Sequence, residues 1–102
     1  MNGPATNLLV IQGALIHKET LRYTPAGIPL LGLTLQHASE QTEAGLKRKV
    51  ECEVNAVALG DLALEAQRIA PGTSISVRGF LARRSLRSTQ LVLHINTIER
   101  II

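Results

Sequence analysis

The chain has 102 residues, of which 45% are hydrophobic and 19% are charged. This length suits one domain with its own core, and this composition excludes an intrinsically disordered chain, which needs low hydrophobicity and high net charge. Eleven Lys and Arg against eight Asp and Glu give a formal net charge of +3. Such a mild excess is compatible with a polyanionic partner but does not identify one.

The single cysteine, Cys52, excludes an internal disulfide framework and a multi-cysteine zinc site, and favours a reducing, intracellular setting. The only apolar run that could be a targeting segment is Leu8–Ile16. It lacks a basic flank and is far shorter than the roughly 20 apolar residues of a membrane span. We therefore expect a cytoplasmic protein with no membrane partner.

The first third of the chain predicts two strands joined by a turn. Residues 1–7 are small and polar, which predicts a flexible N-terminus. Leu8–His17 has apolar residues at both odd and even positions, so both faces of this strand should be covered. Gly13 within it suggests a bulge. Lys18–Ile28 holds a Thr-Pro-Ala-Gly turn, and Leu30–His37 follows as a strand with alternate leucines on one face.

In the middle of the chain, Ala38–Leu46 is polar and rich in turn-forming residues, which predicts a long loop. Lys47–Val57 alternates between apolar and polar residues and predicts a strand. Its inward side chains should be those of Val50, Cys52, Val54 and Ala56.

The last part of the chain predicts a helix and two strands. Leu59–Ile69 has helical spacing of apolar residues and ends before Pro71-Gly72. Thr73–Ala82 and Gln90–Thr97 are strands, the first with a bulge expected at Gly79. The basic loop Arg83–Thr89 joins them, and Ile98–Ile102 is an apolar tail.

The predicted order is three strands, a helix and two strands. This order is typical of an all-β OB-fold, a five-stranded Greek-key barrel with one short helix between the third and fourth strands. We expect residues 8–102 to form this single domain.

The sequence contains no dinucleotide-binding, P-loop, nucleophile-elbow or metalloprotease motif. The three histidines (His17, His37 and His94) lie apart along the sequence, and Glu51 and Glu53 suit an exposed strand face better than a catalytic carboxylate pair. Since no nucleophile, base and orienting group can be assembled, we expect a protein that is not an enzyme and has no cofactor or metal.

Eight of the eleven basic residues gather in three segments: Lys18 and Arg22; Lys47, Arg48 and Lys49; Arg83, Arg84 and Arg87. In an OB-fold the first and last of these segments flank the strand face that binds oligonucleotides. The residues are therefore candidate contacts to a phosphate backbone, although basic loops are also ordinary solvated surface.

Only two residues are aromatic, Tyr23 and Phe80. Single-strand binders usually stack bases on aromatic rings. Tyr23 is a candidate base-stacking residue, whereas Phe80 suits the core equally well. The scarcity of aromatic residues predicts binding that is mainly electrostatic, weak and strongly dependent on salt.

The first strand also predicts a second surface, because one barrel face cannot hide apolar residues at both parities. We expect Leu8, Val10 and Ile16 to form a homodimer interface. The alternative is that the helix or the C-terminal isoleucines cover them.

The motifs TPAGIP (Thr24–Pro29), LQH (Leu35–His37), EAG (Glu43–Gly45), SISVRGFL (Ser74–Leu81) and LVLH (Leu91–His94) resemble, in order and spacing, the primosomal replication protein N family. The resemblance runs from Asn7 to about Ile98. It implies a homodimer of OB-folds that binds single-stranded DNA. It also implies a bacterial, nucleoid-associated protein that binds and stimulates the restart helicase and helps to assemble the primosome.

Residues carry over from the family only in part. The family's basic position in the first loop matches Arg22, and its basic loop between the last two strands matches Arg83, Arg84 and Arg87. Where well-known members have a stacking tryptophan this chain has Glu51, and Ala38 replaces a basic residue. These departures predict weaker DNA binding.

Three functional hypotheses follow from the sequence. The first is a single-stranded DNA-binding partner of the restart helicase. The second is an OB adaptor that binds only protein, through basic loops that meet an acidic partner. The third is an RNA-binding OB domain, since phosphate contacts carry no sugar identity.

Overall fold

The computed structural model describes residues 5–101. Its elements in chain order are β1 (Leu9–Lys18), β2 (Arg22–Tyr23), β3 (Pro29–Glu43), β4 (Leu46–Leu59), α1 (Asp61–Gln67), β5 (Ser74–Arg83) and β6 (Leu91–Arg100). Residues 1–4 of the predicted flexible N-terminus lie outside the described residues. Further along that segment, the Asn7 side-chain amide exchanges two hydrogen bonds with the backbone of Leu81.

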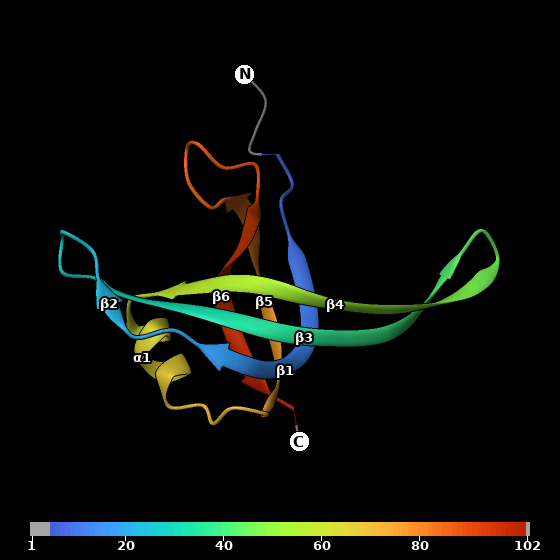
Figure 1. Cartoon of the computed structure of the whole chain (residues 1–102), viewed down its shortest axis with the longest axis horizontal. Coiled ribbons are helices and arrows are strands. Elements are labelled where there is room, and N and C mark those ends of the chain that lie inside the picture. The colour runs from blue at the N-terminus through green and yellow to red at the C-terminus, as the bar shows by residue number, and fades with distance from the viewer. Residues whose placement is uncertain (1–4, 102) are drawn as a thin grey trace.

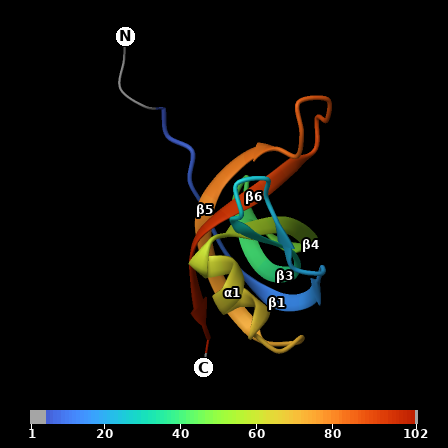
Figure 2. The same cartoon turned by 90° about the vertical axis from the view of Figure 1, so that its left-hand side faces the viewer.

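The five long strands close into a barrel (Figures 1 and 2). The first part of β1 pairs with β5 and its last part pairs with β3, so β1 joins the two ends of the sheet. β4 and β6 pair in parallel, and α1 lies between β4 and β5 in the sequence. This is the predicted OB-fold. The helix is shorter at both ends than the predicted Leu59–Ile69, and at its start Leu59 still belongs to β4.

The core is built from the inward parity of the strands. The alternate leucines of β3 (Leu31, Leu33 and Leu35) are buried as predicted, and alternate residues of β5 are buried as well. The helix α1 adds small side chains that let it approach the barrel closely. The fully buried large side chains are Leu15, Leu31, Leu35, Ile75, Val77 and Leu93. Burial of each such side chain contributes about 1.5–3 kcal/mol relative to exposure, so these positions hold the barrel closed.

The predicted loop at Ala38–Leu46 is wrong. β3 and β4 pair without interruption from Leu30↔Leu59 to Glu43↔Leu46, and their outer halves form a two-stranded arm beyond the barrel (Figure 1). The turn is Ala44-Gly45, with φ of 54° and 77°. Two positive φ angles in a two-residue hairpin loop are typical of a type I′ turn. Both faces of the arm contact solvent, so its strands lack the apolar alternation that reveals a half-buried strand.

The predicted inward position of Cys52 is also wrong, because Cys52 is exposed. It has the same parity as the buried Ala56, but it pairs with His37 where the strands leave the barrel. Val54 is half-buried against the core, and Val50 is half-buried further out on the arm. The prediction correctly placed Cys52 on the same face of the strand as Ala56. It did not identify where along this strand the barrel ends.

Other details of the prediction are corrected or confirmed. The register shift in β1 falls between Leu15 and His17 rather than at Gly13. A Cβ on Gly13 would lie 2.7 Å from the carbonyl oxygen of Gln36, so this glycine permits a close approach of β3. The predicted irregularity at Gly79 is present in the pairing of β5 with β6. The predicted apolar tail begins inside β6, which ends only at Arg100.

No helix within residues 5–101 is long and apolar enough to span a bilayer. In the same part of the chain, no group of three or more His, Cys, Asp or Glu side chains is placed to hold a metal ion.

Candidate nucleic-acid interface

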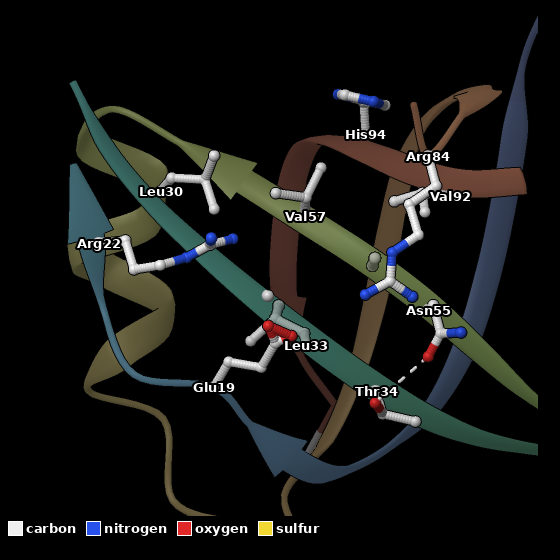
Figure 3. Close-up of a pocket in the computed structure, with 12 residues that line it drawn as sticks. Glu19, Arg22, Leu30, Leu33, Thr34, Asn55, Val57, Arg84, Val92 and His94 are labelled. Carbon is white, nitrogen blue, oxygen red and sulfur yellow. Dashed lines mark hydrogen bonds between the residues drawn. The ribbon is translucent and has the colours of Figure 1, made fainter. Parts of the chain in front are cut away.

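A groove of about 260 Å³ lies on the outer face of β3 and β4 (Figure 3). Its floor comes from residues whose parity is opposite to that of the core leucines. Gly32 pairs with Val57 and Thr34 pairs with Asn55 across the two strands. The Thr34 hydroxyl donates to Oδ1 of Asn55 at 3.4 Å, which leaves the Asn55 amide nitrogen available to a ligand.

Two arginines approach this groove from different elements (Figure 3). Arg22 belongs to β2, which pairs with the start of β3 through Arg22↔Leu30. Arg84 follows β5, and its backbone N–H donates to the Gln90 carbonyl at 2.9 Å, which closes the base of the loop. Within residues 5–101 neither guanidinium has a hydrogen bond or ion pair, so both remain available to an anion.

The wall of the groove at β6 carries an aromatic pair. The ring of His94 lines the groove and stacks on Phe80, with centroids 5.0 Å apart and planes 5° from parallel. Phe80 is 39% exposed, so it is not a core residue. Tyr23 is 62% exposed beside Arg22 but is not a lining residue of the groove. A base entering the groove therefore meets His94, which the sequence did not single out.

The basic segment of β4 lies far from these arginines. Arg22 pairs with Leu30 at one end of β3 and Lys47 pairs with Thr42 near the other, about 40 Å away along a strand. Two of its three cations are ion-paired at the surface, Lys47 with Glu40 at 3.6 Å and Arg48 with Glu43 at 3.1 Å.

The path from the groove to this segment crosses acidic residues. Lys47 and Lys49 lie on the same face of β4 as Asn55. Glu51 and Glu53 lie on that face between Asn55 and the two lysines. Arg48 has the other parity. A nucleic acid that follows β4 from the groove to the arm would therefore pass two carboxylates before it reaches a lysine.

The remaining predicted contacts divide between the last loop and the helix. Arg83 donates to the Leu86 carbonyl at 3.2 Å, which shapes the loop, and Arg87 is exposed in that loop. The ammonium of Lys18 donates instead to the carbonyls of Gln67 and Ile69, each at 2.7 Å. The structure thus brings Arg22 and Arg84 to one groove and places Lys18 in a structural contact.

Sequence reasoning missed Glu19, Thr34, Asn55 and His94 among the residues that line the groove. Alternation along the second and third predicted strands could have placed Thr34 and Asn55 on its floor. Glu19 had no such signal, because its place depends on the path of the chain after β1.

The predicted dimer residues are exposed apolar side chains of the first strand and its start, since Leu8 directly precedes β1 and Val10 and Ile16 lie within it. Leu8 and Val10 are each 54% exposed and Ile16 is 44% exposed. Neither α1 nor the last isoleucine within the described part of the chain covers them, and Ile98 packs against the core instead.

Residues 7–97 match the family model described as another single-strand binding protein family. The replication restart protein PriB of Neisseria meningitidis serogroup B is 45% identical over 94 residues, which cover 91% of this chain and 93% of that protein. The solved structure of PriB from Ralstonia solanacearum is 38% identical, with a TM-score of 0.88 over 94% of this chain and 98% of that one.

A more distant solved structure shares the fold alone. The single-stranded DNA binding protein of Thermus aquaticus, in a deletion mutant, has a TM-score of 0.78 at 24% identity, and the match covers 95% of this chain and 51% of that one. The nearer relatives match in sequence, length and fold together. This chain belongs to the PriB family of replication restart proteins, within the wider single-strand binding protein family.

Proposed function

We propose that this chain is a non-enzymatic, single-stranded DNA-binding protein of bacterial replication restart. The observation that carries the proposal is the pair Arg22 and Arg84, two guanidiniums at one groove on the OB face that form no ion pair within residues 5–101. Guanidiniums bind phosphate oxygens through paired hydrogen bonds. The family membership supports the same function, since relatives carry the name of replication restart proteins.

The phosphates would bind first to Arg22 and Arg84, with Arg83 and Arg87 extending the contact along the last loop. Lys47, Arg48 and Lys49 would bind a strand only after it has crossed Glu51 and Glu53. Since electrostatic contacts to phosphates release counterions, some four to six of them give a log–log salt slope of about −3 to −4 for single strands.

The active form is proposed to be a homodimer that associates through Leu8, Val10 and Ile16. Val10 and Ile16 of β1 and Leu8 just before it are exposed apolar side chains of one parity, and the same surface on two copies can bury them. We also propose, on the family resemblance, a cytoplasmic, nucleoid-associated protein that binds and stimulates the restart helicase.

A second candidate is an adaptor that binds protein and little DNA. Leu86 is 87% exposed among the arginines of the last loop, and an exposed leucine there favours a protein partner over a phosphate backbone. Under this alternative, DNA binding is negligible from the start, and substitution of the loop arginines weakens only complex formation with the helicase.

The deciding experiment is a fluorescence-anisotropy titration with oligo(dT) at several salt concentrations, with and without the restart helicase. The double variant Arg22→Ala/Arg84→Ala should weaken dT binding and flatten the salt slope. Arg68→Ala, which removes an exposed cation after α1, is the matched control and should bind as the parent protein does. A salt slope near zero, or equal loss in both variants, would reject DNA binding in this groove.

A helicase unwinding assay separates the two candidates. DNA binding as the main function predicts that the double variant stimulates the helicase poorly. The adaptor predicts that Leu86→Ser also stimulates poorly, because it loses helicase binding, whereas under the first candidate Leu86→Ser stimulates as the parent protein does.

A further inference from the structure

The groove proposed to bind DNA contains a carboxylate. Glu19 follows β1, and its backbone N–H donates to the carbonyl of Gly32 at 2.9 Å. Its side chain lies over Gly32, and Figure 3 shows it in the groove with Thr34 and Leu33. A Cβ on Gly32 would be 2.7 Å from Cδ and Oε2 of Glu19 and 2.9 Å from Oε1. The carboxylate therefore occupies space that a side chain at position 32 would fill.

Within residues 5–101 the Glu19 carboxylate has neither a hydrogen bond nor an ion pair. It lines the same groove as Arg22 and Arg84. A groove that bound only phosphate would be weakened by this negative charge. The carboxylate is instead an unused pair of acceptors in a site that also holds donors, the two guanidiniums and the Asn55 amide nitrogen.

We propose that Glu19 reads a nucleobase, and that the groove prefers guanine to the other three bases. This inference rests on the proposed DNA binding. Single-stranded bases are unstacked and expose their Watson–Crick edges to a protein. Guanine offers two adjacent donors, N1–H and the N2 amino group, to the two carboxylate oxygens, while its O6 accepts from Arg84 or Asn55.

The other bases fit the same groups less well. Thymine has one donor, N3–H, between two carbonyl oxygens that a carboxylate repels. Cytosine and adenine offer only their amino group to Glu19, and the neighbouring ring nitrogen is an acceptor. The expected order of affinity therefore has guanine first and thymine last.

The test is an anisotropy titration of dT oligonucleotides that carry one central dG, dC, dA or dT. A bidentate contact to a base discriminates by about fivefold or more, so the parent protein should bind the dG oligonucleotide about fivefold more tightly than dT. In Glu19→Gln the preference should shrink to less than about twofold. Glu65→Gln, which removes an exposed carboxylate from α1, is the matched control and should keep the preference.

A second variant separates the position of the carboxylate from its charge. In Gly32→Ala the new Cβ displaces only the flexible end of Glu19, so the barrel should remain folded and the charge is retained. The dG preference should fall as it does in Glu19→Gln. An unchanged preference in both variants would overturn the assignment to Glu19. Tight binding of all four oligonucleotides with equal affinity would overturn base reading alone, whereas no binding to any would overturn the proposed function as well.

Discussion

The ammonium of Lys18 donates to two backbone carbonyls at the C-terminal end of α1, that of its last residue Gln67 and that of Ile69 just beyond it, at 2.7 Å each. The last carbonyls of a helix have no partner within it and carry partial negative charge. The last turn of α1 has no basic residue of its own, so Lys18 supplies the cation from the end of β1. A residue that sequence reasoning assigned to DNA therefore ties the helix to the barrel.

Lys18→Met should lower the free energy of unfolding by about 1–2 kcal/mol, because it removes a charged hydrogen-bond donor and retains the aliphatic stem. The corresponding fall in Tm is about 5–10 °C for a domain of this size. Thermal unfolding followed by circular dichroism measures it. The affinity for oligo(dT), measured well below the Tm, should stay within about twofold of the parent protein. A large loss of DNA affinity with an unchanged Tm would show instead that Lys18 contacts DNA, as the sequence predicted.

Gly79→Ala should destabilise the barrel by about 1–3 kcal/mol. A Cβ at this position would overlap the backbone carbonyl oxygen of His94, and a backbone atom cannot move aside as a side chain can. Denaturant unfolding measures the change in free energy. Gly32→Ala is the matched control, since its Cβ meets only the side chain of Glu19 and should change stability by less than about 0.5 kcal/mol. Equal stability of the two variants would contradict this account of the β5–β6 irregularity.

Sequence reasoning predicted the barrel because its strands are half-buried. Alternation revealed the inward leucines of β3 and the buried residues of β5, and a change of period revealed α1. The same logic failed on the arm, where both faces contact solvent. Cys52 kept its correct parity but lay beyond the end of the barrel, which depends on strand pairing rather than on local pattern.

The candidate site was predicted in the same uneven way. Clusters of charge pointed to Arg22 and Arg84, and the fold placed both at one groove. Charge counting could not show that Lys18 binds the end of a helix or that Glu19 lies over Gly32 in the same groove as those arginines, because both placements depend on contacts between different elements of the fold. Whether a charged side chain binds a ligand depends on which neighbours it meets after folding.

Val10→Lys should shift the proposed homodimer towards the monomer. Val10 is 54% exposed in the single chain and pairs with Arg78 on β5, so a lysine there adds a charge beside an existing cation and lies in the interface in both copies. Sedimentation velocity at micromolar concentration measures the change. Leu86→Ser is the control, because it replaces an apolar residue that is more exposed than Val10 and lies outside β1. It should leave the mass of the sedimenting species unchanged. A parent protein that sediments as a monomer would reject the dimer.

Two positions where the resemblance predicts a departure from the family pattern face each other. Ala38 of β3 and Glu51 of β4 are cross-strand partners, on the same face of the sheet as Thr34 and Asn55. A tryptophan at position 51 could lie over the small side chain of Ala38 and offer a stacking surface next to the groove. The path from the groove to the arm would then hold an aromatic ring in place of a charge that repels phosphate.

Glu51→Trp should therefore strengthen binding to single-stranded DNA. Stacking of one base contributes about 1–3 kcal/mol, so we expect the Kd for oligo(dT) to fall at least about fivefold, by anisotropy at constant salt. Glu51→Gln removes the charge without adding a ring and should lower the Kd by no more than about twofold. The salt slope should change little between the two variants, because stacking releases no counterions. Equal gains in both would show that charge removal, rather than base stacking, limits binding along β4.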